Sequence, residues 1–374
     1  MSENEKHVLY ALNSEERKKI YALIGRYWDD WINYWENKSK YRENKEIDPY
    51  VIYPSIPIVW FGNINEYFKS PVKIVTVGLN PSNHEFSNDG TPPYKVETRF
   101  KDAEEFEKNR EITDFANINE NSLYNLIKAY NNYFKYKLYP DYFSAFERVL
   151  QNLPIPSSYG DVEHEPPKEL YGTSKNSSNY PDDYKQHRCT AIHIDSETAI
   201  ATKYLWDKPK EDFKKGFGEV NGEKFFQEFQ DVKKYLSKKK GKNEFGELFK
   251  VFLGILQPDI IVVSSKPLRD VLVKIIKKAK KVNNKEERRL FFEDFDSPAK
   301  KEDNNFRVSY IIDGRLWLYG RNNTGPGPFY LLTGKGSPEE QEQTKLKNIK
   351  KEHAFFHDSF KESGIKKLTD ILEK

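Results

Sequence analysis

The stretch that decides the fold is PVKIVTVGLNPSNHEF (residues 71–86). Val72, Ile74, Val75 and Val77 form a short apolar run that ends abruptly in Gly-Leu-Asn-Pro. An apolar run of this length, closed by turn residues, is typical of a parallel strand that is buried on both faces and has reached its carboxyl end. We therefore expect an α/β protein whose ligands bind beyond the carboxyl ends of its strands.

Three further segments have the character of strands of the same sheet: CTAIHID (189–195), PDIIVVSS (258–265) and PFYLLTG (328–334). The segment FRVSYIIDGRLWLYG (306–320) alternates on both sides of Asp-Gly, which predicts a β-hairpin. Because helical patterns separate the apolar strands, we expect an open, mostly parallel sheet. The helices are expected around residues 102–110, 119–132, 140–152, 245–256 and 267–280, and from residue 338 to about 351.

The N-terminal region predicts a long helix. Asn13 and Glu16 have the spacing of a capping box, and apolar residues then recur at helical spacing from Ile20 to Trp35. We expect residues 1–50 to form a helical addition packed on the core, and residues 51–374 to form the main domain. Within that domain the segment at about 154–187 is polar and rich in Pro, Gly and Ser, which is typical of an insert that is either functional or disordered.

Composition excludes several classes of protein. Charged residues make up 32% of the 374-residue chain, and no stretch approaches the roughly 20 apolar residues that a membrane helix needs. The first residues lack the pattern of a secretion signal, so we expect a cytoplasmic protein. Cys189 is the only cysteine, which excludes an internal disulfide and a four-thiolate metal site. The net charge is only +3, but lysines cluster at 233–242 and 274–289, where they either bind phosphates or form solvated helix faces.

The stretch GLNPS (78–82), directly after a buried strand, resembles the first motif of the uracil-DNA-glycosylase superfamily. It is closest to the branches that use Gly-x-Asn-Pro, the mismatch-specific and single-strand-selective types. The resemblance continues through the second and third strands to the KGSP turn (335–338) and covers roughly residues 55 to 350 without the insert. It implies a three-layer α/β/α sandwich around a central, mostly parallel four-stranded sheet.

The resemblance also implies catalytic residues. By position Asn80 holds the water that attacks the sugar, although the alternative is that Asn80 only forms a turn. Lys335 and Ser337 take the place of a His- or Asn-Pro-Ser turn near the cleaved bond. Lys335 departs from that pattern, which puts the electrophilic role in doubt. The alternative second motif begins at Arg321-Asn322, and we favour the Lys335 turn.

Two residues of the expected pocket differ from other branches of the superfamily. Ser82 stands where some branches carry a blocking tyrosine, so a 5-substituted pyrimidine would fit, unless Ser82 only caps a turn. Asp195 stands where an asparagine reads the base, and an acceptor-only carboxylate favours a cytosine-like base; the alternative is a helix cap or an ion pair. His193 alternates with Asp195 on one strand face, and a core histidine is an equal interpretation. The residues expected to contact the base are Gly78, Leu79, Pro81, Ser82, His84, His193 and Asp195.

Residues at the other strand ends are expected to contact the DNA backbone, although structural capping is an equal interpretation for the first three: Ser264, Ser265, Lys266, Arg321 and Asn322. His353 and His357 have a spacing that suits zinc, but no third ligand is evident. We therefore expect neither a metal nor a cofactor.

The function that the resemblance implies is a monofunctional DNA glycosylase that removes a flipped-out modified pyrimidine. The chain resembles bacterial antiphage glycosylases that excise glucosylated cytosines, so the expected partner is double-stranded phage DNA. We expect the protein to act as a monomer and not to associate with a membrane. Three alternatives stay open: a housekeeping uracil or mismatch repair glycosylase, a non-catalytic nucleic-acid-binding module, and an α/β enzyme of free nucleosides or nucleotides.

Overall fold

The chain forms two compact units, each assembled from three segments. The first comprises Met1–Trp60, Leu79–Tyr130 and Asp195–Ile255, and the second comprises Phe61–Gly78, Asn131–Ile194 and Leu256–Lys374. The expected boundary at residue 50 lies outside the described residues, so that division into domains stays a prediction. The computed structural model describes residues 8–39, 58–78, 120–135, 153–155, 191–195, 247–263, 289–292, 306–312, 314–321 and 337–373, with single positions at 143, 146, 149, 150, 211, 214, 219, 220 and 223.

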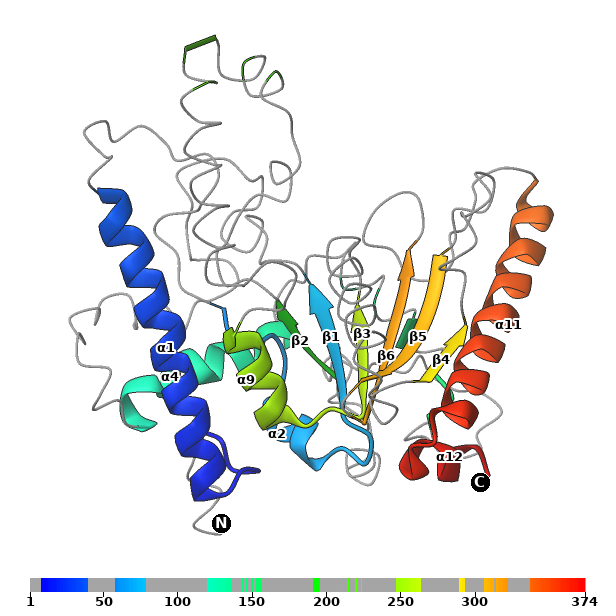
Figure 1. Ribbon diagram of the computed structural model, residues 1–374, viewed down its shortest axis with the longest axis horizontal. Coiled ribbons are helices and arrows are strands. Elements are labelled where there is room, and N and C mark those ends of the chain that lie inside the picture. Colours follow the sequence, from blue (N-terminus) through cyan, green and yellow to red (C-terminus); the bar gives the residue numbers. More distant parts are fainter. Residues whose placement is uncertain are drawn as a thin grey trace. The chain divides into compact units, whose positions relative to one another are not determined.

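The described residues form a six-stranded sheet, whose strands lie side by side in the order β2-β1-β3-β6-β5-β4 (Figure 1). The first four strands in this order run parallel, and the last two continue the sheet antiparallel. The protein is therefore α/β, as the sequence predicts. The strands, in sheet order, are β2 (Ala191–Asp195), β1 (Ile74–Gly78), β3 (Ile260–Val263), β6 (Arg315–Arg321), β5 (Phe306–Ile312) and β4 (Arg289–Phe292).

The centre of the sheet is buried on both faces. Every residue of β1, β2 and β3 is buried, which explains their nearly unbroken apolar sequences. Ile74 of β1 pairs with Ile260 of β3, and Ile260 pairs in turn with Leu316 of β6. The three strands predicted from apolar runs before residue 266 are thus confirmed.

The fourth parallel strand is β6, the second strand of the predicted hairpin. The sequence placed that strand at 328–334, which lies outside the described residues. Leu316, Trp317 and Leu318 are buried in succession, at 0%, 5% and 0% exposure. Three consecutive buried residues indicate a strand covered on both faces, whereas simple alternation covers only one. Before β6, Gly314 takes a φ of 68°, the left-handed conformation that the turn requires.

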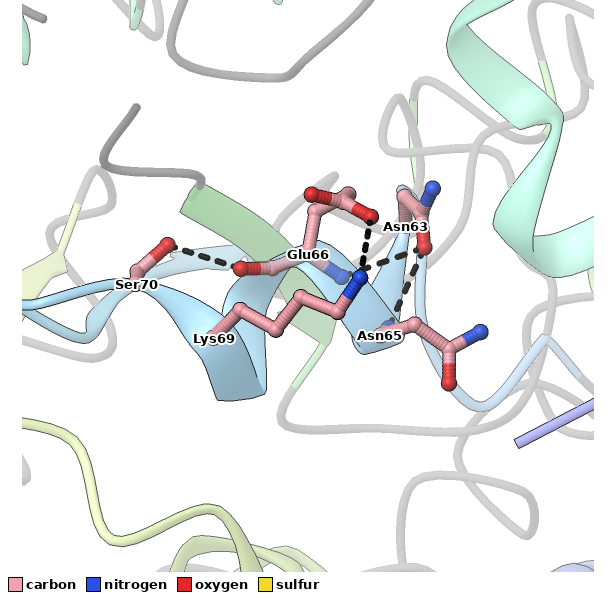
Figure 2. A network of polar contacts seen from close by, with 5 residues as sticks. All are labelled: Asn63, Asn65, Glu66, Lys69 and Ser70. Carbon is pink, nitrogen blue, oxygen red and sulfur yellow. Dashed lines mark hydrogen bonds and ion pairs between the residues drawn. The ribbon is translucent and has the colours of Figure 1, made fainter. Parts of the chain in front are cut away.

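A short helix that the sequence analysis did not predict, α2 (Ile64–Lys69), precedes β1. Asn63 caps it, because the Asn63 side chain accepts hydrogen bonds from the backbone N–H groups of Asn65 and Glu66 at 3.1 and 3.3 Å (Figure 2). At its other end the Ser70 hydroxyl donates to the carbonyl oxygen of Glu66. Lys69 pairs with the Glu66 carboxylate on the exposed side. These local bonds fix the turn that leads into the sheet.

The described helices of the first unit are α1 (Ser14–Ser39), most of α4 (Glu120–Asn131) and most of α9 (Glu247–Leu256). The predicted capping box is confirmed: the N–H of Asn13 donates to Glu16, and the N–H of Glu16 donates to Asn13, both at 2.9 Å. Trp60 packs edge-on against Tyr130, with ring centroids 4.8 Å apart, and against Phe252. Burial raises the pKa of the Tyr130 phenol well above 10.0.

Two helices end the chain, α11 (Pro338–Ser363) and α12 (Lys366–Leu372). The α11 helix packs against β4 and β5 through its second half, where Phe356 and Phe360 are fully buried (Figure 1). It runs beyond the expected end near residue 351 and stops at Gly364, which has a left-handed φ of 67°. Among the described helices, none combines the length and the apolar character that a bilayer span requires.

Candidate functional site at the carboxyl edge of the sheet

The four parallel strands all end at one edge of the sheet, the edge where open α/β proteins bind ligands. Gly78 is the last residue of β1 and is buried. Leu79, Asn80, Pro81, Ser82 and His84 follow it in sequence and lie outside the described residues. Their roles in binding water and base stay predictions.

His193, in the middle of β2, is enclosed by aromatic side chains. It is 1% exposed, and its ring centroid lies 5.4, 5.1 and 5.4 Å from those of Phe61, Phe143 and Phe146. Its Nδ1 lies 2.9 Å from the hydroxyl of Thr76 in β1. These contacts favour the core-histidine interpretation over direct contact with a base.

Asp195 ends β2 and is 6% exposed. Residues two apart in a strand point to the same face, so Asp195 shares the face of His193 one step closer to the edge. A carboxylate buried to this degree requires compensating polar groups, which are common at binding sites as well as in structural ion pairs. Its position at a strand end agrees with the expected base-reading role, which stays a prediction.

The ends of β3 and β6 carry the remaining expected DNA contacts. Val263 is the last residue of β3, and Ser264, Ser265 and Lys266 follow it outside the described residues. Arg321 is the last residue of β6, and Asn322 follows it, also outside the described residues. Because β6 is the fourth parallel strand, Arg321 lies at the same edge of the sheet as the ends of β1, β2 and β3. The position of Arg321 agrees with the alternative second motif, but residues 322–336 lie outside the described residues, so the choice between the two turns stays a prediction.

Ser337 has a structural task. It is exposed and caps α11 through a capping box with Glu340: its N–H donates to the Glu340 carboxylate at 2.7 Å, and its hydroxyl accepts from the Glu340 N–H at 3.2 Å. A hydroxyl that accepts one hydrogen bond can also donate its hydrogen to another acceptor. Lys335 lies outside the described residues, and the catalytic roles of both residues stay predictions.

His353 and His357 are both exposed on α11, and Nδ1 of His357 lies 3.8 Å from the Asp358 carboxylate. The described part of the chain contains no group of three or more His, Cys, Asp or Glu side chains that could hold a metal ion.

The opposite, amino edge of the sheet carries a polar cluster that the sequence analysis missed. The Asp259 carboxylate accepts a hydrogen bond from the backbone N–H of Lys73 and an ion-paired one from Lys367 of α12, each at 2.7 Å. Nearby, the Tyr67 hydroxyl donates to the carbonyl oxygen of Leu256 at 3.1 Å, and burial, reinforced by the charge of Asp259, raises the pKa of Tyr67 well above 10.0. Each bond joins segments far apart in sequence, so spacing alone could not have identified them.

Thr76, in the middle of β1, is a further residue of interest that the sequence analysis passed over. It is the one polar residue within the apolar run of β1 and is 0% exposed. A hydroxyl inside an otherwise apolar buried strand indicates a specific polar partner, which His193 supplies.

No protein-family model, curated protein or solved structure gives a significant match to this chain.

Proposed function

We propose that this protein is a DNA glycosylase that hydrolyses the N-glycosidic bond of a flipped-out, 5-substituted cytosine, such as a glucosylated hydroxymethylcytosine, in invading phage DNA. The observation that carries the proposal is that β1 ends at Gly78, the first residue of the GLNPS stretch, at the carboxyl edge of a parallel sheet. Asn80 follows two residues later in the sequence, which is the position that the superfamily gives to its water-holding residue. The proposed domain is a three-layer α/β/α sandwich of the uracil-DNA-glycosylase type.

Hydrolysis of an N-glycosidic bond requires only a few functional groups in the site. As the bond breaks, the sugar gains positive charge and the base gains negative charge. In the proposal Asn80 orients the attacking water and Asp195 accepts a hydrogen bond from the exocyclic amine of the cytosine. The small Ser82 leaves room for the 5-substituent. Arg321, as a planar cation that forms paired hydrogen bonds, binds a phosphate that flanks the extruded nucleotide.

The test is base release from phage DNA that carries glucosylated hydroxymethylcytosine and from the same DNA without the modification. Abasic sites are counted as strand breaks after alkali, and the freed base is identified by mass spectrometry. We expect breaks in the modified DNA only. Efficient release of uracil from a uracil-containing duplex, with no release of modified cytosine, would replace the proposal with a repair glycosylase. No release from any of these DNAs would refute glycosylase activity.

Variants at Asn80 separate an enzyme from a binding module. Asn80→Ala should lower the rate of base release by roughly 10²- to 10³-fold, because it removes a preorganised polar group from the transition state. Asn80→Asp is the matched control: other branches carry Asp at this position, so the rate should be retained or raised. DNA affinity should fall steeply with salt for all three proteins. Equal rates for Asn80→Ala and the unchanged protein would refute the assigned role.

The two candidate second motifs are separated by a second pair of variants. Because Arg321 ends the fourth parallel strand, Arg321→Ala should slow base release more than Lys335→Ala does. A larger effect of Lys335→Ala would reverse this choice without affecting the activity itself.

A further inference from the structure

Asp195 is the last residue of β2, which has five residues and is the first strand in the order of the sheet. On its outer side β2 is joined to Phe61 by one reciprocal backbone pair: the Phe61 N–H donates to the His193 carbonyl at 2.8 Å, and the His193 N–H donates to the Phe61 carbonyl at 2.9 Å. On its inner side it neighbours β1. The carboxyl end of β2 is therefore held by its hydrogen-bonded pairing with β1 on one side and by the single backbone pair at His193 on the other.

Side chains also join β2 to β1 at this level. The Thr76 hydroxyl lies 2.9 Å from Nδ1 of His193 and donates to the carbonyl oxygen of Ile192 at 3.4 Å. Both bonds are satisfied together when the imidazole carries its proton on Nδ1 and donates it to the Thr76 oxygen. Thr76 and His193 are 0% and 1% exposed, so water does not readily replace either partner.

The aromatic rings prevent the imidazole from moving to another partner. Phe61, Phe143 and Phe146 each have a ring centroid within 5.4 Å of that of His193, and Phe143 meets it edge-on at an interplanar angle of 87°. Close packing of this kind holds a ring in one orientation. The side-chain bond between β1 and β2 is thus both buried and geometrically fixed.

We propose that Thr76 and His193 are positioning residues, which hold the carboxyl end of β2, and with it Asp195, in place relative to the end of β1. Each lies two residues before the end of its strand, so Thr76 shares a face with Gly78 and His193 shares a face with Asp195. Neither contacts substrate. This inference rests on the proposed function only for its kinetic readout, because the position of β2 can also be measured directly.

The test compares Thr76→Val, which keeps the shape of the side chain but removes the hydroxyl, with Thr76→Ser, which keeps the hydroxyl. The matched control is Ser309→Ala in β5, which removes a buried hydroxyl whose oxygen has no hydrogen-bond partner among the described residues. The first readout is hydrogen–deuterium exchange of the β2 amides. Exchange at Ile194 and Asp195 should rise at least about tenfold in Thr76→Val and stay unchanged in the other two variants.

The second readout is steady-state base release at a temperature where circular dichroism shows each variant to be folded. In Thr76→Val, kcat should fall by roughly tenfold or more, because a shift of the base-binding Asp195 misaligns the bound base with the attacking water. KM should change by less than about threefold, because Asp195 can still accept its hydrogen bond from the base. Thr76→Ser should recover kcat, and Ser309→Ala should retain it.

The outcomes separate the two proposals. Raised exchange with a fall in kcat supports the positioning role, whereas unchanged exchange, or unchanged kcat in an active enzyme, overturns it. If the unchanged protein releases no base, the proposed function fails and the exchange measurement alone decides the positioning role. If Thr76→Val does not fold, Thr76→Ser carries the test: exchange and kcat within about threefold of the unchanged protein support the inference, and a larger change in a folded Thr76→Ser overturns it.

Discussion

Gly62 offers a quantitative test of the packing around β2, because a methyl group at this position meets two separate penalties. Gly62 has a φ of 109°, a conformation that side chains disfavour. A Cβ built at this position would lie 2.9 Å from Cε2 and 3.1 Å from Cδ2 of Phe134. Phe134 is 3% exposed, and its ring is packed at 5.0 Å from both Tyr133 and Phe143, so it has no space to withdraw.

The two penalties give the expected cost of Gly62→Ala. Backbone strain contributes about 1–3 kcal/mol, and overpacking contributes about 1–3 kcal/mol more. The sum is about 2–6 kcal/mol of the free energy of unfolding. For a protein with a total stability of roughly 5–15 kcal/mol, this is a severe loss.

Two other glycines serve as controls that remove the penalties one at a time. Gly314 has a φ of 68°, and no atom lies within 4 Å of the place that an alanine methyl group would take, so Gly314→Ala should cost only the strain, about 1–2 kcal/mol. Gly254 in α9 has no atom within that distance and no left-handed φ, so Gly254→Ala should stabilise the protein by up to about 1 kcal/mol.

The assay is urea unfolding followed by circular dichroism, with free energies obtained by linear extrapolation. The expected order of stability is Gly254→Ala, the unchanged protein, Gly314→Ala and then Gly62→Ala. If Gly62→Ala is no less stable than Gly314→Ala, the close packing of Phe134 against residue 62 is refuted.

Three further predictions concern the amino edge of the sheet. Tyr67→Phe should cost about 1 kcal/mol in urea unfolding, because the Leu256 carbonyl loses its donor. Burial raises the pKa of Tyr67 in the folded state above 10.0, so the protonated phenol stabilises the fold fully below about pH 10 and this stabilisation is lost at higher pH. The fall in the free energy of unfolding above pH 10 should therefore be smaller in Tyr67→Phe. An unchanged fall would contradict the assignment. Gln257→Gly should raise the free energy of unfolding by about 0.5 kcal/mol, because Gln257 has a left-handed φ of 46° that glycine adopts without strain. The midpoint of thermal unfolding should rise accordingly, and a lower midpoint would count against strain at this position. Lys367→Ala should cost no more than about 0.5 kcal/mol and less at high salt, whereas Asp259→Ala should cost about 1 kcal/mol or more because the backbone N–H of residue 73 also loses its acceptor; equal losses in the two variants would argue against that second bond.

Local sequence patterns predicted individual helices and strands better than they predicted which strands lie next to each other in the sheet. Strands β1, β2 and β3 are buried on both faces, so each can be recognised in the sequence as a run of mostly apolar residues. The hairpin of β5 and β6 was predicted from alternation and its Asp-Gly turn. That β6 also pairs with β3 was not predicted, although the consecutive buried residues Leu316, Trp317 and Leu318 carried the signal. Lateral pairing depends on contacts between distant segments, which local spacing does not encode.

Short elements escaped the sequence analysis for a different reason. The α2 helix and β4 have six and four residues, too few for a period to be counted. For α2 the cap was nevertheless visible, because Asn63 and Glu66 have the capping-box spacing that revealed the start of α1.

The same limit applies to the candidate site. Alternation correctly put His193 and Asp195 on one face of a strand, but it could not show that aromatic side chains cover His193. Phe143 and Phe146 come from a distant part of the chain, and only folding brings them onto β2. The strand ends were therefore predictable, while the packing that holds them was not.

The two edges of the sheet differ in what their polar groups already do, and this difference determines what a substitution at each edge will reveal. At the amino edge the protein satisfies its own groups: Asp259 is bonded to Lys73 and Lys367, and Tyr67 is bonded to Leu256. Substitutions there should change stability and leave the chemistry intact. At the carboxyl edge, where we propose that the chemistry takes place, Thr76 and His193 are bonded to each other two residues before the strand ends, so Thr76→Val should lower the rate of base release as well as the stability. A variant series that showed the reverse pattern would place the working edge of the sheet at its amino end.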